Sequence, residues 1–236
     1  MSRTVELAYD FIYSAIASGR LKPGAHIPEE MISAELQVSR TPVREAIRRL
    51  ETEGLVVLTR NSGADVALFS REEIVETFRL RAMLEGYAAE RAATRITPAQ
   101  LAALEKLVQE MLALSRETAE VDLLTNTRLN VAFHLAIAEA AQSQRLYALI
   151  RALVHVPLTI MHHDGWGVQL AHARGYDEHA RIVEALRARD PDLTRSLMQA
   201  HILGARPRLA EEAASGDGAE KDEAPTSASR LKLVTR

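Results

Sequence analysis

The spacing of apolar residues predicts a chain that is mainly helical. Apolar side chains recur every three or four residues over residues 4–18, again from about Glu29, and almost continuously from Ser70 to Ala214. That period places them on one face of a helix. Residues 55–58 and 64–68 are expected to be short strands, joined by a turn. The pattern therefore predicts short helices and a hairpin, followed by a long helical region.

The stretch from Val38 to Leu50 predicts an amphipathic helix of the kind that reads DNA. Thr41 is expected to cap this helix and Pro42 to occupy its first position, where a missing N–H costs nothing. One face is apolar (Val43, Ala46, Ile47, Leu50), and another side carries Arg40, Arg44 and Arg48. Guanidinium groups suit phosphates and guanine edges, and a helix fits the major groove. The alternative is an ordinary solvated surface helix.

The elements around this helix favour the DNA-binding interpretation. A helix from about Glu29 ends before Val38, so a tight turn separates two short helices, as in a helix-turn-helix. Gly54 is suited to end the second helix. The hairpin that follows has the position of a wing, with Arg60 and Gly63 at its tip, and residues 25–27 are expected to form a further short strand.

Composition and charge limit the class of protein. The chain has 236 residues, 47% of them hydrophobic, no cysteine and a formal net charge of −3. The lack of cysteine excludes disulfides and thiolate metal sites. Without an apolar run of about 18 residues to span a membrane, a cytoplasmic protein is expected. Within residues 1–69 the charge is locally basic at residues 39–50, with four arginines against one glutamate, and a dimer would double this small footprint.

Residues 1–69 are expected to form the winged helix-turn-helix domain, and residues 70–212 an antiparallel all-helical bundle of six helices. Ser70 and Glu73 form a capping box that opens the first of these helices, and Thr97-Pro98 starts the second. The others are expected at about 122–141, 143–162, 175–189 and 191–209, with a kink at Pro157. Residues 213–236 lack periodicity and are expected to be disordered.

Four residues of the helical region have the chemistry of a metal site. Asn130 and His134 are one helical turn apart and share a face, whereas His179 and His201 lie on apolar faces that point inward. Three imidazoles and one amide oxygen, if they converge, would bind a divalent metal and leave coordination positions open. The alternative is that each histidine is a hydrogen-bonded core residue.

The N-terminal motifs resemble the winged-helix domain of GntR-family transcription regulators. The resemblance rests on Gly19-Arg20-Leu21-Lys22-Pro23-Gly24, Val38-Ser39-Arg40-Thr41-Pro42-Val43-Arg44-Glu45-Ala46 and Leu50-Glu51-Thr52-Glu53-Gly54-Leu55-Val56. It implies a DNA-binding set in which Arg40 and Arg44 make the main base and phosphate contacts, with Thr41, Arg48, Arg49, Arg60 and the wing tip at Gly63. Two departures are Glu29-Glu30, where a basic residue is frequent, and Asp65, where an aromatic residue is frequent.

The helical region resembles the FCD effector domain of the FadR-type branch of that family. The resemblance rests on Phe78-x-x-Arg81-x-x-x-Glu85, Asn130-x-x-Phe133-His134, Glu178-His179-x-x-Ile182 and His201. It implies that Asn130, His134, His179 and His201 hold a metal ion, most often zinc, with nickel or manganese as alternatives. A small organic acid would complete the coordination, with Arg81 as its carboxylate clamp. Because the usual first ligand is Asp, the neutral Asn130 should weaken metal binding and favour an anionic ligand.

These features together predict a ligand-responsive transcription regulator that binds a palindromic double-stranded DNA operator as a homodimer. One alternative is a helical metal-dependent hydrolase or other metalloenzyme with an accessory N-terminal module, in which Glu85 or Asp177 would be the general base. Another is a DNA-binding dimer whose metal is purely structural. The arginine-bearing helix and the wing favour a regulator. The sequence leaves open the effector, the operator, and whether the protein is a repressor or an activator.

Overall fold

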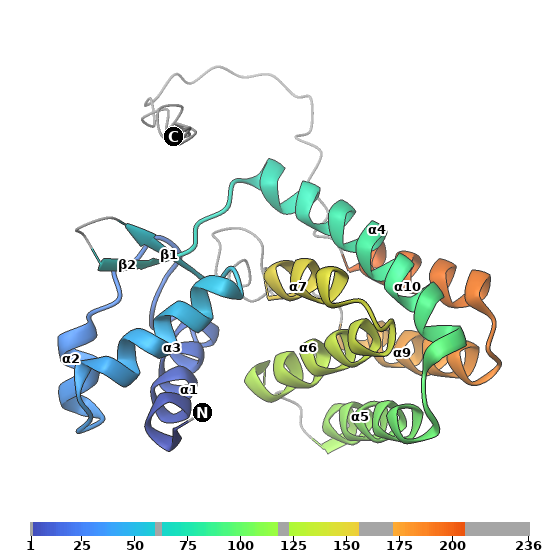
Figure 1. The fold of residues 1–236 in the computed structure, drawn as a ribbon, viewed down its shortest axis with the longest axis horizontal. Helices are drawn as coiled ribbons and strands as arrows, with labels where there is room; N and C mark the ends of the chain where they lie inside the picture. Colours follow the sequence, from blue (N-terminus) through green and yellow to red (C-terminus); the bar gives the residue numbers. More distant parts are fainter. Residues whose placement is uncertain (1, 60–62, 118–122, 156–171, 206–236) are drawn as a thin grey trace.

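Two groups of packed elements make up the structure, a computed structural model that describes residues 2–59, 63–117, 123–155 and 172–205 (Figure 1). The N-terminal domain consists of α1 (Arg3–Ala17), α2 (Glu29–Glu35), α3 (Arg40–Thr52), β1 (Val56–Thr59) and β2 (Gly63–Val66). The helical domain consists of α4 (Arg71–Arg95), α5 (Pro98–Glu117), α6 (Leu123–Ala140), α7 (Gln144–Leu153), α9 (His172–Arg187) and α10 (Pro191–Gly204). The predicted fold class, a winged helix-turn-helix ahead of a helical bundle, is confirmed.

The apolar faces of α1, α2 and α3 meet in one core, because each carries its hydrophobic residues at helical spacing. The most deeply buried members of this core are Ile12, Ile16, Ile27, Ile32, Val43, Ile47 and Leu50. Strands β1 and β2 pair antiparallel, from Val56 opposite Val66 to Thr59 opposite Gly63. The expected strand over residues 25–27 is reduced to a single bridge between His26 and Asp65.

Helix α3 begins earlier than the sequence predicted. Its N-cap is Ser39 rather than Thr41, its first residue is Arg40, and Pro42 lies inside the first turn. Proline is accepted there because the first N–H groups of a helix have no intrahelical partner to lose. As a result, Arg40, Arg44 and Arg48 all lie on the helix itself.

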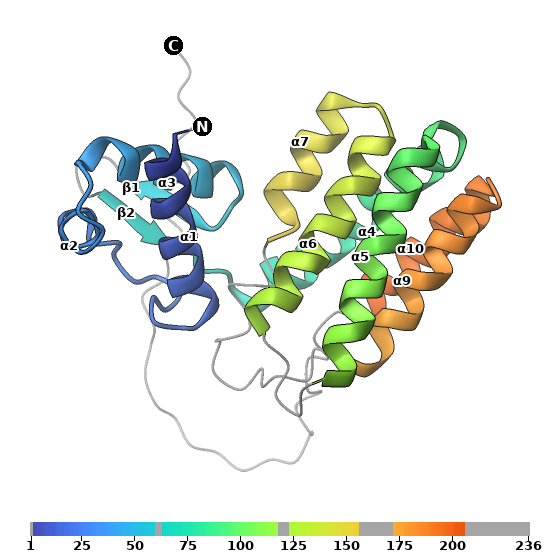
Figure 2. The same cartoon turned by 90° about the horizontal axis from the view of Figure 1, so that it is seen from below.

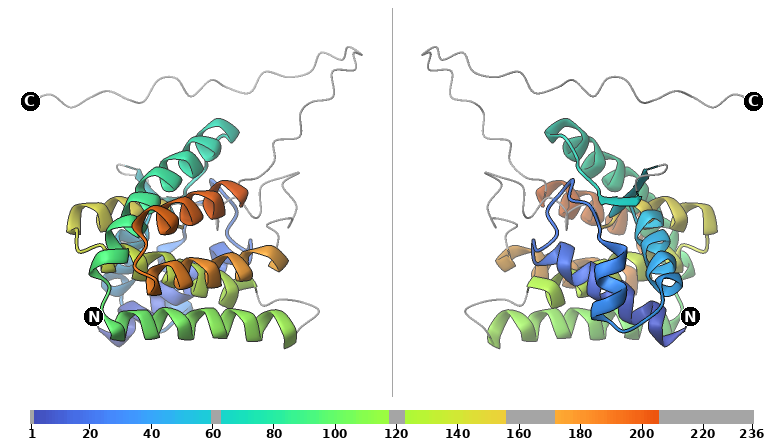
Figure 3. Two further views of the ribbon diagram at one scale, coloured as in Figure 1. Left: turned by 90° about the vertical axis from the view of Figure 1, so that its right-hand side faces the viewer. Right: turned by 90° about the vertical axis from the view of Figure 1, so that its left-hand side faces the viewer.

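The helical domain is built around α4 and α6. Ser70 Oγ accepts a hydrogen bond from the Glu73 amide, and Glu73 Oε2 accepts one from the Ser70 amide, so the predicted capping box is present. Helix α10 packs along α4, α9 contacts both α10 and α5, and α6 contacts α4, α5 and α7 (Figure 3). Figure 2 shows that α6 and α7 are the bundle helices nearest to the N-terminal domain.

Several helix ends differ from the sequence prediction. Helix α7 ends at Leu153 instead of continuing to residue 162, α9 begins at His172, and α10 ends at Gly204. Pro157 and the predicted tail 213–236 lie outside the described residues. Within the part of the chain that the structure describes, no helix combines the length and hydropathy needed to cross a bilayer.

Gly54 marks a close approach between the two domains. It ends α3 with φ at +72°, as expected for a residue that follows a helix, and a Cβ there would lie 2.5 Å from the carbonyl oxygen of Ala152. Gly24 has a similar φ of +77°, but the nearest atom to a Cβ there, in Leu68, would be 3.8 Å away.

Replacing Gly54 by alanine should therefore cost more than replacing Gly24. Both substitutions carry the strain of a left-handed alanine, about 1–2 kcal/mol. Only Gly54→Ala also meets a backbone carbonyl, so we expect it to lower the free energy of unfolding by about 1–3 kcal/mol more than Gly24→Ala. Urea unfolding followed by circular dichroism measures both values, and equal losses would argue against the close approach.

Candidate DNA-binding surface and metal centre

The outer side of α3 carries the predicted DNA-contacting residues. Arg40, Thr41, Arg44 and Arg48 are exposed, whereas Pro42, Val43, Ala46, Ile47 and Leu50 are buried in the domain core. The helix therefore presents a row of guanidinium groups to solvent. Such a row offers planar, forked donors for phosphates and for the edge of guanine.

Two of these arginines are paired with acids at the start of α2. Arg44 Nε donates to Glu29 Oε2 at 2.9 Å, and Arg40 Nη2 lies 2.7 Å from Glu30 Oε1. Glu29-Glu30 is the place where the sequence departs from the family pattern, and the structure shows that the acids orient the arginines of α3. A guanidinium group has five N–H donors, so one such contact leaves others for DNA.

Arg49 lies on a different side of α3 from this row. Its side chain is 26% exposed, its Nη1 lies 3.0 Å from Glu6 Oε2, and its Nε donates to Glu53 Oε1 at 3.1 Å. The guanidinium carbon also lies 3.8 Å from the centre of the Tyr9 ring. These contacts give Arg49 a structural role within the N-terminal domain, and its predicted contact to DNA stays a prediction.

The wing is braced by Asp65. This residue accepts a hydrogen bond from Thr59 Oγ1 at 3.2 Å, and its Oδ1 lies 2.9 Å from His26 Nδ1. Gly63, with φ at +90°, starts β2 beside the His26 ring, where any Cβ would clash. Arg60 lies outside the described residues. A polar Asp65 in place of an aromatic residue thus links the two wing strands to residue 26.

Three predicted histidines come together inside the helical domain. His134 of α6, His179 of α9 and His201 of α10 are all buried, and they offer ligand nitrogens that lie within 4.8 Å of one another. Their ring centroids are 4.4 to 5.9 Å apart. Imidazole nitrogens are good ligands for zinc and related divalent metals. The donor set fits a metal ion, as the sequence predicted.

Two glutamates orient these imidazoles. Glu85 Oε2 lies 2.6 Å from His134 Nδ1, and Glu178 Oε2 lies 2.9 Å from His201 Nδ1. A carboxylate at Nδ1 favours a proton on that nitrogen and leaves the Nε2 lone pair for a metal. Sequence analysis did not assign this role to either glutamate, although both belong to the motifs that carry the family resemblance.

Glu85 is shared between His134 and Arg81. Arg81 Nε donates to Glu85 Oε1 at 2.7 Å, and both side chains are almost fully buried. Burial by itself would raise the pKa of Glu85, but Arg81 and His134 together lower it to about 2. Burial lowers the pKa of His134, and the Glu85 carboxylate only partly opposes this. At neutral pH Glu85 is therefore ionised and His134 neutral, which is the state that binds a metal.

Two predicted members of the site are less closely involved. Asn130 lies one turn before His134 on α6 and is half-buried, so its role as the fourth ligand stays a prediction. Arg81 is buried and engaged with Glu85, whereas the sequence predicted it as a clamp for a carboxylate ligand. Its remaining guanidinium donors are the groups that such a clamp would use.

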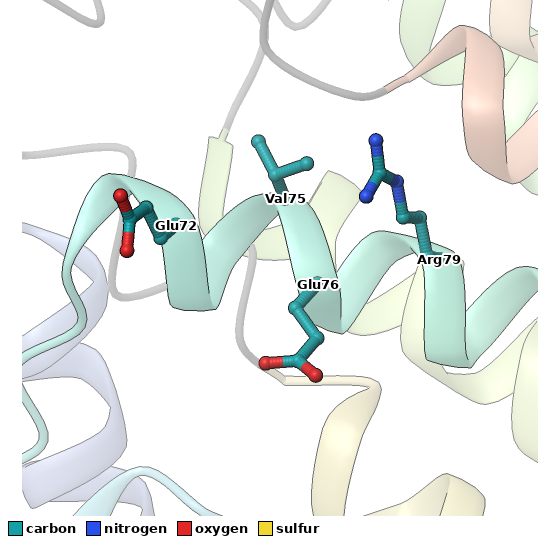
Figure 4. A pocket seen from close by; sticks show the side chains of 4 residues that line it. All are labelled: Glu72, Val75, Glu76 and Arg79. Atoms are coloured by element: carbon teal, nitrogen blue, oxygen red, sulfur yellow. The ribbon is translucent and has the colours of Figure 1, made fainter.

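A separate, solvent-exposed pocket lies on the first half of α4. Glu72, Val75, Glu76 and Arg79 line it (Figure 4). The three charged side chains are exposed to solvent, and Val75 is half-buried. None of the predicted ligands lines this pocket, so the candidate site is the buried histidine cluster.

His155, to which sequence analysis assigned no role, is buried between the two domains. It follows α7, it is 5% exposed, and its Nε2 lies 3.8 Å from Glu53 Oε2 at the end of α3. Its ring meets the edge of Tyr13 with centroids 5.9 Å apart. Arg151 Nη2 lies 3.1 Å from the other carboxylate oxygen, Glu53 Oε1. A histidine inside the predicted helix 143–162 carries no sequence signal for such a position.

Two family models match the chain. The model for bacterial regulatory proteins of the gntR family matches residues 4–66, and the model for the FCD domain matches residues 76–204. The first match covers the wing and α3, and the second covers the three histidines.

Individual relatives match over most of the chain. A probable D-xylose utilization operon transcriptional repressor from Paenarthrobacter nicotinovorans is 31% identical over 214 residues, which cover 89% of this chain and 90% of the relative. The Nta operon transcriptional regulator of Aminobacter aminovorans is 29% identical over 185 residues, covering 78% and 84%. Among solved structures, E. coli McbR/YncC is similar with a TM-score of 0.70 and 24% identity, over 86% of this chain and 95% of that one, which supports the fold.

Acid should destabilise the protein through His155. Burial lowers the pKa of this histidine from 6.5 to about 4, although Glu53 opposes the shift and Arg151 and Arg49 add to it. In the unfolded chain His155 binds a proton at about pH 6.5, whereas in the folded chain it stays neutral down to about pH 4. The free energy of unfolding therefore falls as the pH drops from about 6.5 to about 4. Relative to His155→Gln, we expect the wild type to lose up to about 3 kcal/mol over this window. Urea unfolding at several pH values measures the difference, and parallel pH profiles would exclude a neutral, buried His155.

Proposed function

The chain belongs to the gntR family of bacterial regulatory proteins, and we propose that it senses a small organic acid at a metal site in its FCD domain. The relatives are transcription regulators rather than enzymes, and the chain is accordingly a DNA-binding regulator with an effector domain. In the proposal, a homodimer binds a palindromic operator and the acid changes its affinity for that operator.

The observation that carries the proposal is the buried group of His134, His179 and His201. Asn130 supplies a fourth ligand from the same helix as His134, and zinc is the preferred ion, with nickel or manganese as alternatives. A divalent ion held there supplies positive charge and open coordination positions for a carboxylate. Arg81, one turn before Glu85 on α4, supplies further positive charge from the protein.

The DNA contacts come from the exposed side of α3 and from the wing. Arg40, Thr41, Arg44 and Arg48 contact bases and phosphates, with Arg60 and Gly63 at the wing. The basic footprint of one chain is small, and a two-fold symmetric dimer doubles it and places two copies of α3 about one DNA turn apart. That arrangement requires a palindromic operator.

Removing His134 tests the metal site. We expect full-length wild type to bind about one zinc per chain and to gain roughly 5–10 °C in Tm at a zinc concentration of 100 times Kd. His134→Ala leaves two imidazoles and should lose most of the metal and of the Tm shift. Elemental analysis and thermal unfolding give both readouts, with His26→Ala as a control that removes an exposed histidine of the N-terminal domain.

Unchanged zinc binding by His134→Ala would disprove the site. A screen of small carboxylic acids against zinc-loaded protein then separates a sensor from a structural metal. A sensor shows a Tm shift with one class of acid that disappears in His134→Ala. A structural metal shows no acid-dependent shift at all.

Removing Arg44 tests the DNA surface. On a duplex that the wild type selects from a random library, Arg44→Ala should weaken binding by roughly 10- to 100-fold, because a forked arginine contact is worth about 1–3 kcal/mol. Arg187→Ala is the matched control, since Arg187 is equally exposed and paired with one glutamate but lies in the helical domain. Fluorescence anisotropy measures both Kd values, and equal affinities would reject α3 as the DNA-reading helix.

A further inference from the structure

The carboxylate of Glu53, just after the last residue of α3, is shared by three helices. Its side chain is 4% exposed. The Tyr9 hydroxyl of α1 donates to Oε2 at 2.7 Å, and Arg49 Nε of α3 donates to Oε1 at 3.1 Å. Arg151 of α7 donates its Nη2 to the same Oε1, also at 3.1 Å. Arg151 is therefore the donor that crosses from the helical domain to the end of the DNA-reading helix.

A second contact between the domains lies beside the first. Arg128 of α6 donates to Asp10 Oδ1 of α1 at 3.0 Å, and its guanidinium carbon lies 5.4 Å from the centre of the Tyr13 ring. Tyr13 in turn meets His155, next to α7. The N-terminal domain therefore makes two ionic contacts with the helical domain, one through α6 and one through α7.

Because Glu53 is buried, its contact with Arg151 resists displacement of α3. A carboxylate removed from water is stable only while its oxygens keep charged or polar partners. If α3 tilted away from α7, Glu53 would lose Arg151, and Arg49 alone would be left on Oε1. A guanidinium group is planar, so its hydrogen bond also restricts the direction from which the carboxylate approaches. The pair thus resists both separation and tilt.

We propose that Glu53, held by Arg151, is the positioning residue that sets the direction of α3 relative to the helical domain. The proposal rests on the proposed function, in which two copies of α3 read the two halves of one operator. If each α3 is fixed to its own helical domain and the dimer is symmetric, the distance between the half-sites is fixed too. Arg151 contacts no DNA in this arrangement, yet it determines which operator spacing the protein accepts.

The first experiment tests, without DNA, whether the direction of α3 relative to the helical domain is fixed. The chain has no cysteine, so spin labels on Glu45→Cys in α3 and Glu184→Cys in α9, both exposed positions, report the separation of α3 from the helical domain. Labelled chains diluted with unlabelled protein give the distance distribution within one chain by pulsed electron resonance. We expect a narrow distribution in the otherwise wild-type chain and a clearly broader one with Arg151→Gln. Equal widths would overturn the proposal, whatever the DNA experiments show.

The control is Arg195→Gln, which removes a more exposed arginine (49% against 32%) from an ion pair with Glu90 inside the helical domain. It should leave the distribution narrow. Arg151 is 32% exposed, so its replacement opens no cavity in the core. Arg151→Lys keeps a charged donor for Glu53 and should keep most of the narrow distribution.

The consequence for DNA is tested with operators of altered spacing. On the selected duplex, lengthening the spacer by two base pairs should weaken wild-type binding by about tenfold or more, because the two half-sites no longer match the two α3 helices. Arg151→Gln should reduce this penalty to about threefold or less while its affinity for a single half-site stays unchanged. Arg151→Lys should restore the penalty, which a merely destabilised protein would not do.

The possible results distinguish a failure of the Glu53 proposal from a failure of the proposed function. An Arg151→Gln protein with the wild-type spacing penalty overturns the role of Glu53 and leaves the regulator intact. If the wild type binds operators of every spacer length equally well, both the fixed direction of α3 and the simultaneous reading of two half-sites are refuted. A wild type without DNA affinity refutes the proposed operator binding, and the spin-label distances still decide the position of α3.

Discussion

A buried carboxylate needs donors around it, and two glutamates impose that constraint on this protein. Glu85 sits inside the helical domain between Arg81 and His134, and Glu53 sits between the domains with Tyr9 and Arg151. Each removes a charge from water, which is unfavourable until its partners are in place. The elements that supply those partners are thereby held in one arrangement. The candidate site and the joint between the domains depend on the same physical requirement.

Helix α6 connects the candidate site with the contact between the two domains. It carries His134 into the buried histidine cluster, and Arg128, six residues earlier, reaches Asp10 of α1. It also packs against α7, which supplies Arg151. A ligand that changed the position of α6 would therefore act directly on a contact to the N-terminal domain. Coupling between the sites requires that the ligand favours one position over another.

The acids of α2 show how little net charge says about a DNA-binding surface. Glu29 and Glu30 make the N-terminal domain slightly acidic, yet they lie against Arg44 and Arg40 and orient them. Exposed ion pairs of this kind contribute little to stability. Their effect is on the direction of the guanidinium groups, which matters for a planar, forked donor.

The sequence by itself determined the features that depend on neighbours along the chain. The helical period identified α1 to α7, and Ser70 with Glu73 identified the start of α4. Inward-facing positions made His134, His179 and His201 candidates, and the family resemblance selected them as a metal set. The start of α3 was misplaced because Pro42 is also accepted inside a first turn. Such signals are local, since a cap or a helix face involves residues only a few positions apart.

Only the tertiary structure decided which charged side chain meets which partner. Glu85 meets His134, Glu178 meets His201, and Glu53 meets Arg151 across 98 positions of sequence. His155 and Arg49, which sequence analysis left without a role or assigned to DNA, both belong to the joint at Glu53. Nothing in the spacing of the residues distinguishes these side chains from solvated ones. Their partners are fixed by how helices distant in the chain pack together, and for the buried Glu85 and Glu53 the loss of a partner would leave a carboxylate without compensation.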